Sequence, residues 1–307
     1  MALVKAKRFN IYPKILLDGA SGAGKTYSAL SLATGYDAKA GHKGIALVDT
    51  ENGRANYYAD QFDFGVIDDL GAGRNADDKY SPESYIAAIQ EAVDAGCSVL
   101  VIDSLSHEWQ YLNRVHDSMP GNSFQNWRPL KARHTKLFEY ILQAPICIIA
   151  TARSKEEYVL EANDKGKQTV SKKGLAPIQD SQIEYEYTVT WNIAQDTHVA
   201  VTTKDNTHLF EGSYRPLTKE DGGRLYDWAN SGVTAPKHEA APVAAQSPTD
   251  DIASVKQLIN ATAGRLYATH KEAVMSTVKK YAPSGNPNSI TDIDVARSLL
   301  EELNAIA

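Results

Sequence analysis

The chain has 307 residues, of which 43% are hydrophobic and 23% are charged, and this composition excludes a disordered or fibrous protein. Its formal net charge of -6 gives no general indication of nucleic-acid binding, although a local basic strip can exist within an acidic total. Cys97 and Cys147 both lie in apolar runs, which is typical of buried reduced thiols. The chain shows neither a bilayer-spanning apolar run nor a signal-peptide pattern, so we expect a cytoplasmic protein.

Short apolar runs alternate with helical patterns between about residues 14 and 228, which predicts an α/β domain with a mainly parallel sheet. Ser81 and Pro82 have the residue types preferred at the N-cap and first position of a helix. The last two strands are close together and predict an antiparallel hairpin. The expected strands are residues 14–17, 44–48, 98–102, 146–151, 187–193 and 198–203, and the expected helices are residues 25–33, 82–95 and 129–143.

The composition changes after Ser231, where the chain becomes rich in Ala and Pro and loses its periodicity. This stretch predicts a flexible linker over residues 233–250, between a core domain at 1–232 and a small helical module at 251–307. Apolar residues at helical spacing predict three helices in the module, with the third opened by Thr291.

A phosphate-binding loop follows the first predicted strand. The sequence G-A-S-G-A-G-K-T fits G-x-x-x-x-G-K-[ST] at every position, and a helical pattern comes directly after it. Backbone N–H groups of such a loop face phosphates, while the lysine contacts the β- and γ-phosphates and the threonine hydroxyl binds Mg²⁺. A glycine-rich turn that matches by chance is the alternative, and the flanking strand and helix argue against it. The predicted ATP-binding residues are Gly19, Ala20, Ser21, Gly22, Ala23, Gly24, Lys25 and Thr26.

Two acidic positions are candidates for the remaining chemistry. Asp103 ends the apolar run at 98–102, where an ATPase of this type places the acid that holds magnesium, so Thr26 and Asp103 are the expected metal ligands. Glu51 follows the second predicted strand and suits a general base that activates water for attack on the γ-phosphate. Either acid taken alone could simply begin a solvated turn.

The motifs resemble those of the RecA family of recombination ATPases. D-T-E at residues 49–51 is similar to the D-A-E of that family, and V-I-D-S at 101–104 is similar to its V-V-D-S. The resemblance implies a RecA-like P-loop NTPase core in which Glu51 activates the attacking water. It also implies that Thr151 senses the γ-phosphate, although RecA has glutamine there, and that Lys204 acts in trans across a subunit interface. A solvated hairpin lysine is the alternative for Lys204.

The sequences VDTENGRA, LVIDS and IIATAR together look most like the short RecA-like ATPases of bacteriophages, which are associated with single-strand annealing and recombination. This resemblance covers residues up to about 232. It implies ATP and Mg²⁺ as cofactors, single-stranded DNA as a partner, assembly into a homo-oligomeric ring or filament, and the host cytoplasm as the location.

Two regions are candidates for DNA binding, because loops after the corresponding strands hold single-stranded DNA in RecA-like folds. Residues 113–134 mix aromatic and basic side chains, and residues 154–180 read as a long polar loop with several lysines. Trp127 could instead belong to the apolar face of a helix, and acids in the second region partly cancel its lysines. The candidates are Arg114, Trp127, Arg128, Lys131 and Arg133 in the first region and Lys165, Lys167, Lys172 and Lys173 in the second.

These patterns leave competing functions. The first is a DNA-stimulated ATPase that promotes annealing or strand exchange. The second is a nucleotide-gated interaction module, whose helical tail recruits a replication or single-strand-binding protein. A small-molecule P-loop kinase ranks last, because we find neither a lid-like arginine cluster nor an acceptor pocket in the sequence.

Overall fold

The structure is a computed structural model that describes residues 5–67, 69–71, 76–121, 123–162, 168–180, 183–233, 252–304 and 306. The chain divides into two compact units, Met1–Thr234 and Ala235–Ala307. The predicted linker lies outside the described residues from position 234 onward. Within the described part of the chain, no helix is long and apolar enough to cross a membrane.

The first unit is built on one sheet, as the alternation of apolar runs and helical patterns predicted. Its strand order is β3-β2-β4-β5-β1-β7-β8, and β6 pairs with β5 outside this order. All neighbours in the order are parallel except β7 and β8, which form the expected antiparallel pair. The strands are β1 Lys14–Gly19, β2 Ile45–Asp49, β3 Gly65–Ile67, β4 Val99–Asp103, β5 Cys147–Ala162, β6 Gln168–Pro177, β7 Val189–Ile193 and β8 Ala200–Asp205.

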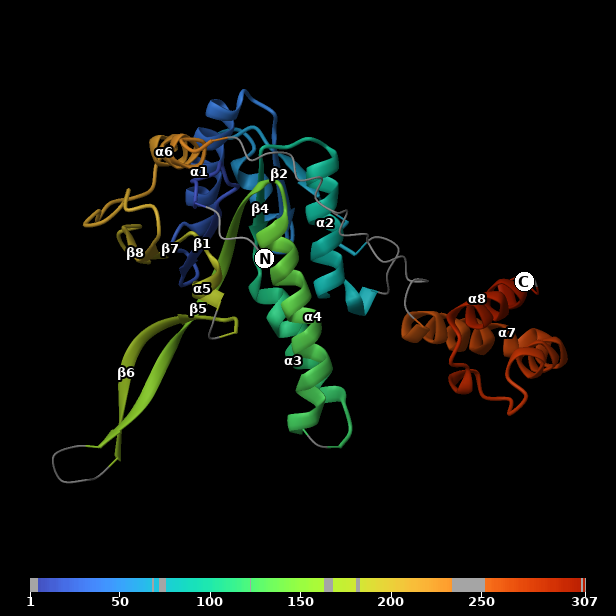
Figure 1. The fold of residues 1–307 in the computed structure, drawn as a ribbon. Coiled ribbons are helices and arrows are strands. Elements are labelled where there is room, and N and C mark those ends of the chain that lie inside the picture. The colour runs from blue at the N-terminus through green and yellow to red at the C-terminus, as the bar shows by residue number, and fades with distance from the viewer. Residues whose placement is uncertain are drawn as a thin grey trace. The chain divides into compact units, whose positions relative to one another are not determined.

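Helices cover both faces of this sheet, because successive strand residues point to opposite faces and both sets are apolar. Ile15 and Leu17 pack in one core cluster with residues of α1 and α6, whereas Leu16 packs in another with residues of α2 and α4. Figure 1 shows these helices around the sheet. The sequence LVI within β4 is buried on both sides in the same way. The helices of this unit are α1 Lys25–Ala40, α2 Pro82–Asp94, α3 Ser106–Ser118, α4 Ser123–Gln143, α5 Ile183–Glu186 and α6 Lys219–Ala229, with 3-10 turns η1 Arg54–Tyr58 and η2 Ala76–Asp78.

The start of α2 follows the sequence signals closely. Ser81 is its N-cap and accepts a hydrogen bond from the backbone N–H of Ser84, and Pro82 takes the first helical position. By contrast, α4 begins six residues before the predicted start at Pro129, which therefore lies inside the helix. The missing N–H of Pro129 is tolerated because Trp127 and Leu130, on either side of it, pack against α3.

Residues 154–180 were expected to form an irregular loop, and this expectation is wrong for the described part. β5 continues past the sheet to Ala162, and it pairs antiparallel with β6 from Ser154↔Pro177 to Ala162↔Gln168. The two segments form a hairpin because each can satisfy the backbone hydrogen-bonding groups of the other after the strand leaves the sheet. Residues 163–167 at its turn lie outside the described residues.

The second unit contains helices packed around their own apolar core, which includes Val255, Ile259, Leu299 and Leu303. α7 spans Ile252–Tyr281 and is interrupted by non-helical backbone at His270. The 3-10 turn η3 Pro287–Ser289 precedes α8 Ile293–Asn304. The side chain of Asp292, rather than Thr291, accepts the hydrogen bonds from the first backbone N–H groups of α8.

Two glycines allow α1 and α6 to approach closely. A Cβ atom at Gly35 would lie 1.7 Å from the carbonyl oxygen of Lys219, and one at Gly222 would lie 2.0 Å from that of Leu32. The opposing atoms belong to the backbone, so a side chain at either position forces the helices apart. This close contact helps hold α6 against the helix that follows the phosphate-binding loop.

We predict that Gly222→Ala lowers the free energy of unfolding of the first unit by about 1–3 kcal/mol, because the added methyl group overpacks the helix contact. Gly223→Ala is the matched control, since its Cβ would make only ordinary van der Waals contacts, with the Lys39 side chain at 3.6 Å and the carbonyl oxygen of Gly35 at 3.8 Å. Higher helix propensity should make the control neutral or up to about 1 kcal/mol stabilising. Denaturant unfolding followed by circular dichroism measures both, and equal midpoints for the two variants would contradict the prediction.

Candidate active site

The loop between β1 and α1 has the conformation that its glycines predict. Gly22 and Gly24 have φ angles of 83° and 84°, in the left-handed region that favours glycine. Gly24 is the residue before the first turn of α1, so the loop turns sharply into the helix N-terminus. The Nζ atom of Lys25 donates hydrogen bonds to the carbonyl oxygens of Gly19 at 2.9 Å and Ala20 at 2.8 Å. The ammonium group of Lys25 is therefore held against the backbone carbonyl groups at the start of the loop.

One carboxylate joins this loop to two strands of the sheet. Asp103 ends β4 and is buried, and its Oδ2 accepts a hydrogen bond of 2.5 Å from the hydroxyl of Thr26. Its Oδ1 accepts a second bond of 2.5 Å from the hydroxyl of Thr151 on β5. Burial raises the pKa of Asp103, while the two hydroxyl groups and the charge of Lys25 act in the opposite direction. The three elements are thereby held in register at one point.

Glu51 is presented by a tight turn after β2. The carboxylate of Asp49 shapes this turn, because it accepts hydrogen bonds from the backbone N–H of Glu51 at 2.6 Å and of Ala55 at 3.0 Å. The Glu51 carboxylate forms a bidentate ion pair with Arg153, in which Nε lies 2.8 Å from Oε1 and Nη2 contacts Oε2. Arg54 lies 3.9 Å away. Burial by itself would raise the pKa of Glu51, but Arg153, His107 and Arg54 lower it below the ordinary value.

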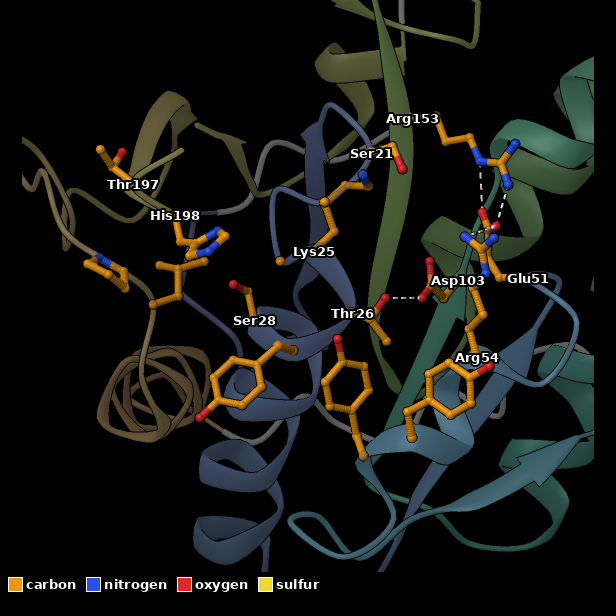
Figure 2. A pocket seen from close by; sticks show the side chains of 17 residues that line it. Ser21, Lys25, Thr26, Ser28, Glu51, Arg54, Asp103, Arg153, Thr197 and His198 are labelled. Carbon is orange, nitrogen blue, oxygen red and sulfur yellow. Dashed lines mark hydrogen bonds and ion pairs between the residues drawn. The ribbon is translucent and has the colours of Figure 1, made fainter. Parts of the chain in front are cut away.

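These groups surround a cavity of about 820 Å³ (Figure 2). Lys25, Thr26 and Asp103 line one part of it, and Glu51 and Arg153 lie beside them. Away from these groups the wall becomes aromatic and apolar. It is formed there by Tyr27, Tyr57, Tyr58, His198, Pro216 and Leu217. The cavity therefore combines a cationic, N–H-rich end with a flat-sided end, which suits a triphosphate attached to a planar base.

The oxygen atoms at the cationic end suit magnesium. Among the described residues, no cluster of three or more His, Cys, Asp or Glu side chains could hold a metal ion by itself. Thr26 and Asp103 instead offer one hydroxyl and one carboxylate in contact with each other. Mg²⁺ commonly keeps several waters and takes only one or two protein oxygens together with substrate phosphates. The residues present fit that arrangement.

Two of the residues proposed from the resemblance lie away from the cavity wall. Thr151 is fully buried behind Asp103, and the exposed part of β5 that reaches the cavity is Arg153, two residues later on the same side of the strand. Lys204 lies on β8, where its Nζ donates to the carbonyl oxygen of Tyr185 at 2.5 Å. Arg153 was missed in the sequence, although its alternation with Thr151 placed it on the right face.

The first candidate DNA-binding region forms α3 and α4. Trp127 stacks against His116 with ring centroids 4.4 Å apart and against Trp109 at 5.6 Å, so it belongs to the interface between the two helices. Arg133 forms a bidentate ion pair with Glu83, at 2.9 and 2.7 Å. Arg114 donates to the backbone of residue 77. Arg128 and Lys131 are exposed on α4.

In the second candidate region, Lys165 and Lys167 lie outside the described residues. Lys172 and Lys173 lie on β6, where the backbone but not the side chains is described. The structure therefore places two predicted lysines on one strand of the hairpin.

A match to a family model covers most of the residues of this site. A family model described as an AAA domain matches residues 11–219. The solved structure of a KaiC-like protein from the hyperthermophilic archaeon Pyrococcus horikoshii OT3 is similar at 13% sequence identity and a TM-score of 0.38, over 68% of this chain and 85% of that one. No curated protein matches. Since the family model covers more than half of the chain, including the whole phosphate-binding loop and Asp103, the chain belongs to the AAA domain family of P-loop ATPases.

Proposed function

We propose that this protein hydrolyses ATP in response to single-stranded DNA and promotes annealing or strand exchange as a homo-oligomer. The observation that carries the enzymatic part is the shared cavity of Lys25, Thr26, Asp103 and Glu51. A phosphate cradle after β1, a magnesium ligand set that includes the end of β4, and a carboxylate base after β2 converge there from the carboxyl ends of parallel strands of one sheet. Ligands of open α/β sheets bind at such carboxyl ends.

The chemistry follows from these positions. The loop N–H groups, the α1 N-terminus and Lys25 hold the negative charge of the phosphates. Thr26 and Asp103 would hold Mg²⁺, which when bound neutralises charge on the β- and γ-phosphate oxygens. Glu51 accepts a proton from the water that attacks the γ-phosphorus, and the turn shaped by Asp49 fixes the direction of the Glu51 backbone.

The DNA part is supported by what leaves the catalytic edge of the sheet. α3 begins three residues after Asp103, and the hairpin of β5 and β6 begins immediately after Arg153. Figure 1 shows the strands of the hairpin, the end of α3 and the start of α4 all extending toward the bottom of the view. Phe124, which is 88% exposed, lies on α4 with Arg128 and Lys131. An exposed aromatic ring among cations is suited to stacking on bases and contacting the phosphate backbone.

We predict that Lys25→Ala weakens ATP binding, whereas Glu51→Gln preserves binding and slows hydrolysis by about two to four orders of magnitude, the contribution typical of a positioned general base. Binding is measured with a fluorescent ATP analogue in the presence of Mg²⁺, and turnover by phosphate release. Unchanged turnover in Glu51→Gln would remove this carboxylate from the mechanism.

For DNA, we predict that Arg128→Glu and Lys131→Glu each weaken binding of a single-stranded oligonucleotide and reduce the steepness of its salt dependence, because each removes a phosphate contact. Lys43→Glu is the control, since Lys43 is exposed just before β2, at the other edge of the sheet. Fluorescence anisotropy at several salt concentrations measures the effect. Equal losses in all three variants would indicate a general charge effect and contradict a site on α4.

A second candidate function is recruitment of a replication or single-strand-binding protein through the tail. It is favoured by the separate core of the second unit, whose surface still exposes Leu258, Tyr267 and Met275. We predict that deletion of residues 235–307 leaves ATP turnover by the first unit within about twofold, because the cavity is lined only by residues up to Leu217. Loss of turnover on deletion would contradict this division of labour.

A further inference from the structure

The turn between β7 and β8, at residues 194–199, contacts the phosphate-binding loop through two side chains. The Nε2 atom of Gln195 donates a hydrogen bond to the carbonyl oxygen of Ser21 at 2.9 Å. The Nδ1 atom of His198 lies 3.0 Å from the carbonyl oxygen of Ala23. Since a carbonyl oxygen can only accept, Nδ1 of His198 carries the hydrogen and donates it. Two of the loop carbonyl groups are therefore bound by the β7–β8 turn.

The glycines of the loop leave room for this contact. A Cβ atom at Gly19 would lie 2.7 Å from the carbonyl oxygen of Ile193, the last residue of β7. Cβ atoms at Gly22 and Gly24 would lie 3.8 and 3.4 Å from the two donor nitrogens of the turn. The loop thus packs against the end of β7 and the β7–β8 turn at each of its three glycines.

The two hydrogen bonds fix the direction of two backbone N–H groups. In a trans peptide unit the carbonyl oxygen and the N–H of the next residue point in opposite directions, and both peptide units here are trans. The carbonyl group of Ser21 faces the turn, so the N–H of Gly22 points away from it. The same relation holds between Ala23 and the N–H of Gly24. N–H groups of such a loop are the groups that bind phosphates.

We propose that Gln195 and His198 are positioning residues that hold the phosphate-binding loop in the conformation in which it receives the phosphates of ATP. The inference rests on the ATP site of the proposed function and adds residues that act through the loop. Lys25 bonds the carbonyl oxygens of Gly19 and Ala20, but its charge is needed at the β- and γ-phosphates. The bonds from the turn, in contrast, can persist when the triphosphate enters.

The backbone of His198 decides which substitutions test this role. Its φ of 56° lies in the left-handed region, which residues other than glycine rarely adopt and which asparagine and histidine tolerate best. Glycine and asparagine therefore separate the effect of the side-chain bond from that of the backbone. Figure 2 shows His198 and Glu51 on opposite sides of Lys25, so a change at His198 leaves the general base in place.

The test measures the dissociation constants of ATP and ADP with Mg²⁺, by competition with a fluorescent ATP analogue, and also KM and kcat. His198→Gly keeps the left-handed backbone and removes the donor. We expect the dissociation constants and the KM for ATP to rise about three- to tenfold, the effect of one lost hydrogen bond. The kcat should stay within about twofold, because the loop holds the phosphates equally before and during the reaction.

Two further variants identify the donor as the cause. His198→Asn should bind ATP like the unsubstituted protein, because its Nδ2 amide lies where Nδ1 of the imidazole lies and also donates. Gln195→Met has a similar length without a donor, and it should weaken binding by a factor like that of His198→Gly. Equal weakening in His198→Gly and His198→Asn would overturn the proposal. So would unchanged dissociation constants in both donor-free variants, or a fall in kcat while ATP binding is unchanged.

Asp196→Asn controls for disturbance of the turn. Asp196 is exposed between the two positioning residues, and neither of their bonds to the loop involves it. Loss of its negative charge should leave the dissociation constant of ATP unchanged or slightly lower, because the phosphates are anionic. Weakening equal to that of Gln195→Met would contradict a specific role for the two donors. Thermal unfolding without nucleotide verifies that each variant is folded at the assay temperature.

The binding measurements also separate this proposal from the proposed function. If the unsubstituted protein binds ATP but neither hydrolyses it nor responds to single-stranded DNA, the proposed function fails, whereas the dissociation constants of the variants still decide the role of the turn. Unchanged dissociation constants in the variants of a DNA-stimulated ATPase would remove that role and leave the proposed function intact.

Discussion

The active site depends on the two hydrogen bonds accepted by the carboxylate of Asp103. One comes from Thr26 at the start of α1 and the other from Thr151 on β5, so a single buried side chain holds together the phosphate-binding helix, its own strand and the neighbouring strand. An ionised group at this depth would be costly without such donors, which is why burial raises its pKa while the hydroxyls oppose the shift. The oxygens that would hold magnesium are therefore positioned by contacts within the protein.

The sheet determines which residues can meet at this point. β1 is flanked by β5 and β7, and β5 is flanked by β4, so the loop after β1 and the acid after β4 lie one strand apart. β2 adds Glu51 on the far side of β4, with Asp49 level with Asp103. The same parallel arrangement places Arg153, at the end of the part of β5 that lies in the sheet, beside Glu51. β5 therefore contributes Arg153 to the cavity wall before it leaves the sheet and pairs with β6.

The differences between expectation and structure concern segments whose fate depends on distant partners. The stretch 154–180 has a mixed polar composition that is compatible with a loop, yet its two halves pair as β5 and β6. Pro129 resembles a helix start, but packing of Trp127 against Trp109 extends α4 through it. In the same way Arg133, predicted to contact DNA, forms an ion pair with Glu83, 50 residues away. Local residue preferences contain no information about such partners.

The sequence by itself determined the features that depend on short-range geometry: the phosphate-binding loop at 19–26, the acid that ends β4, the cap of α2 and the alternation that predicted a parallel sheet with a late antiparallel pair. Backbone conformation at glycine, capping and strand periodicity act over a few residues, so their signals can be recognised in the chain. Only the tertiary structure decided that Arg153 neutralises Glu51, which lies 102 residues earlier, and that Thr151 faces Asp103 rather than the cavity. Such pairings depend on the order and register of strands, which are set by the packing of the whole domain.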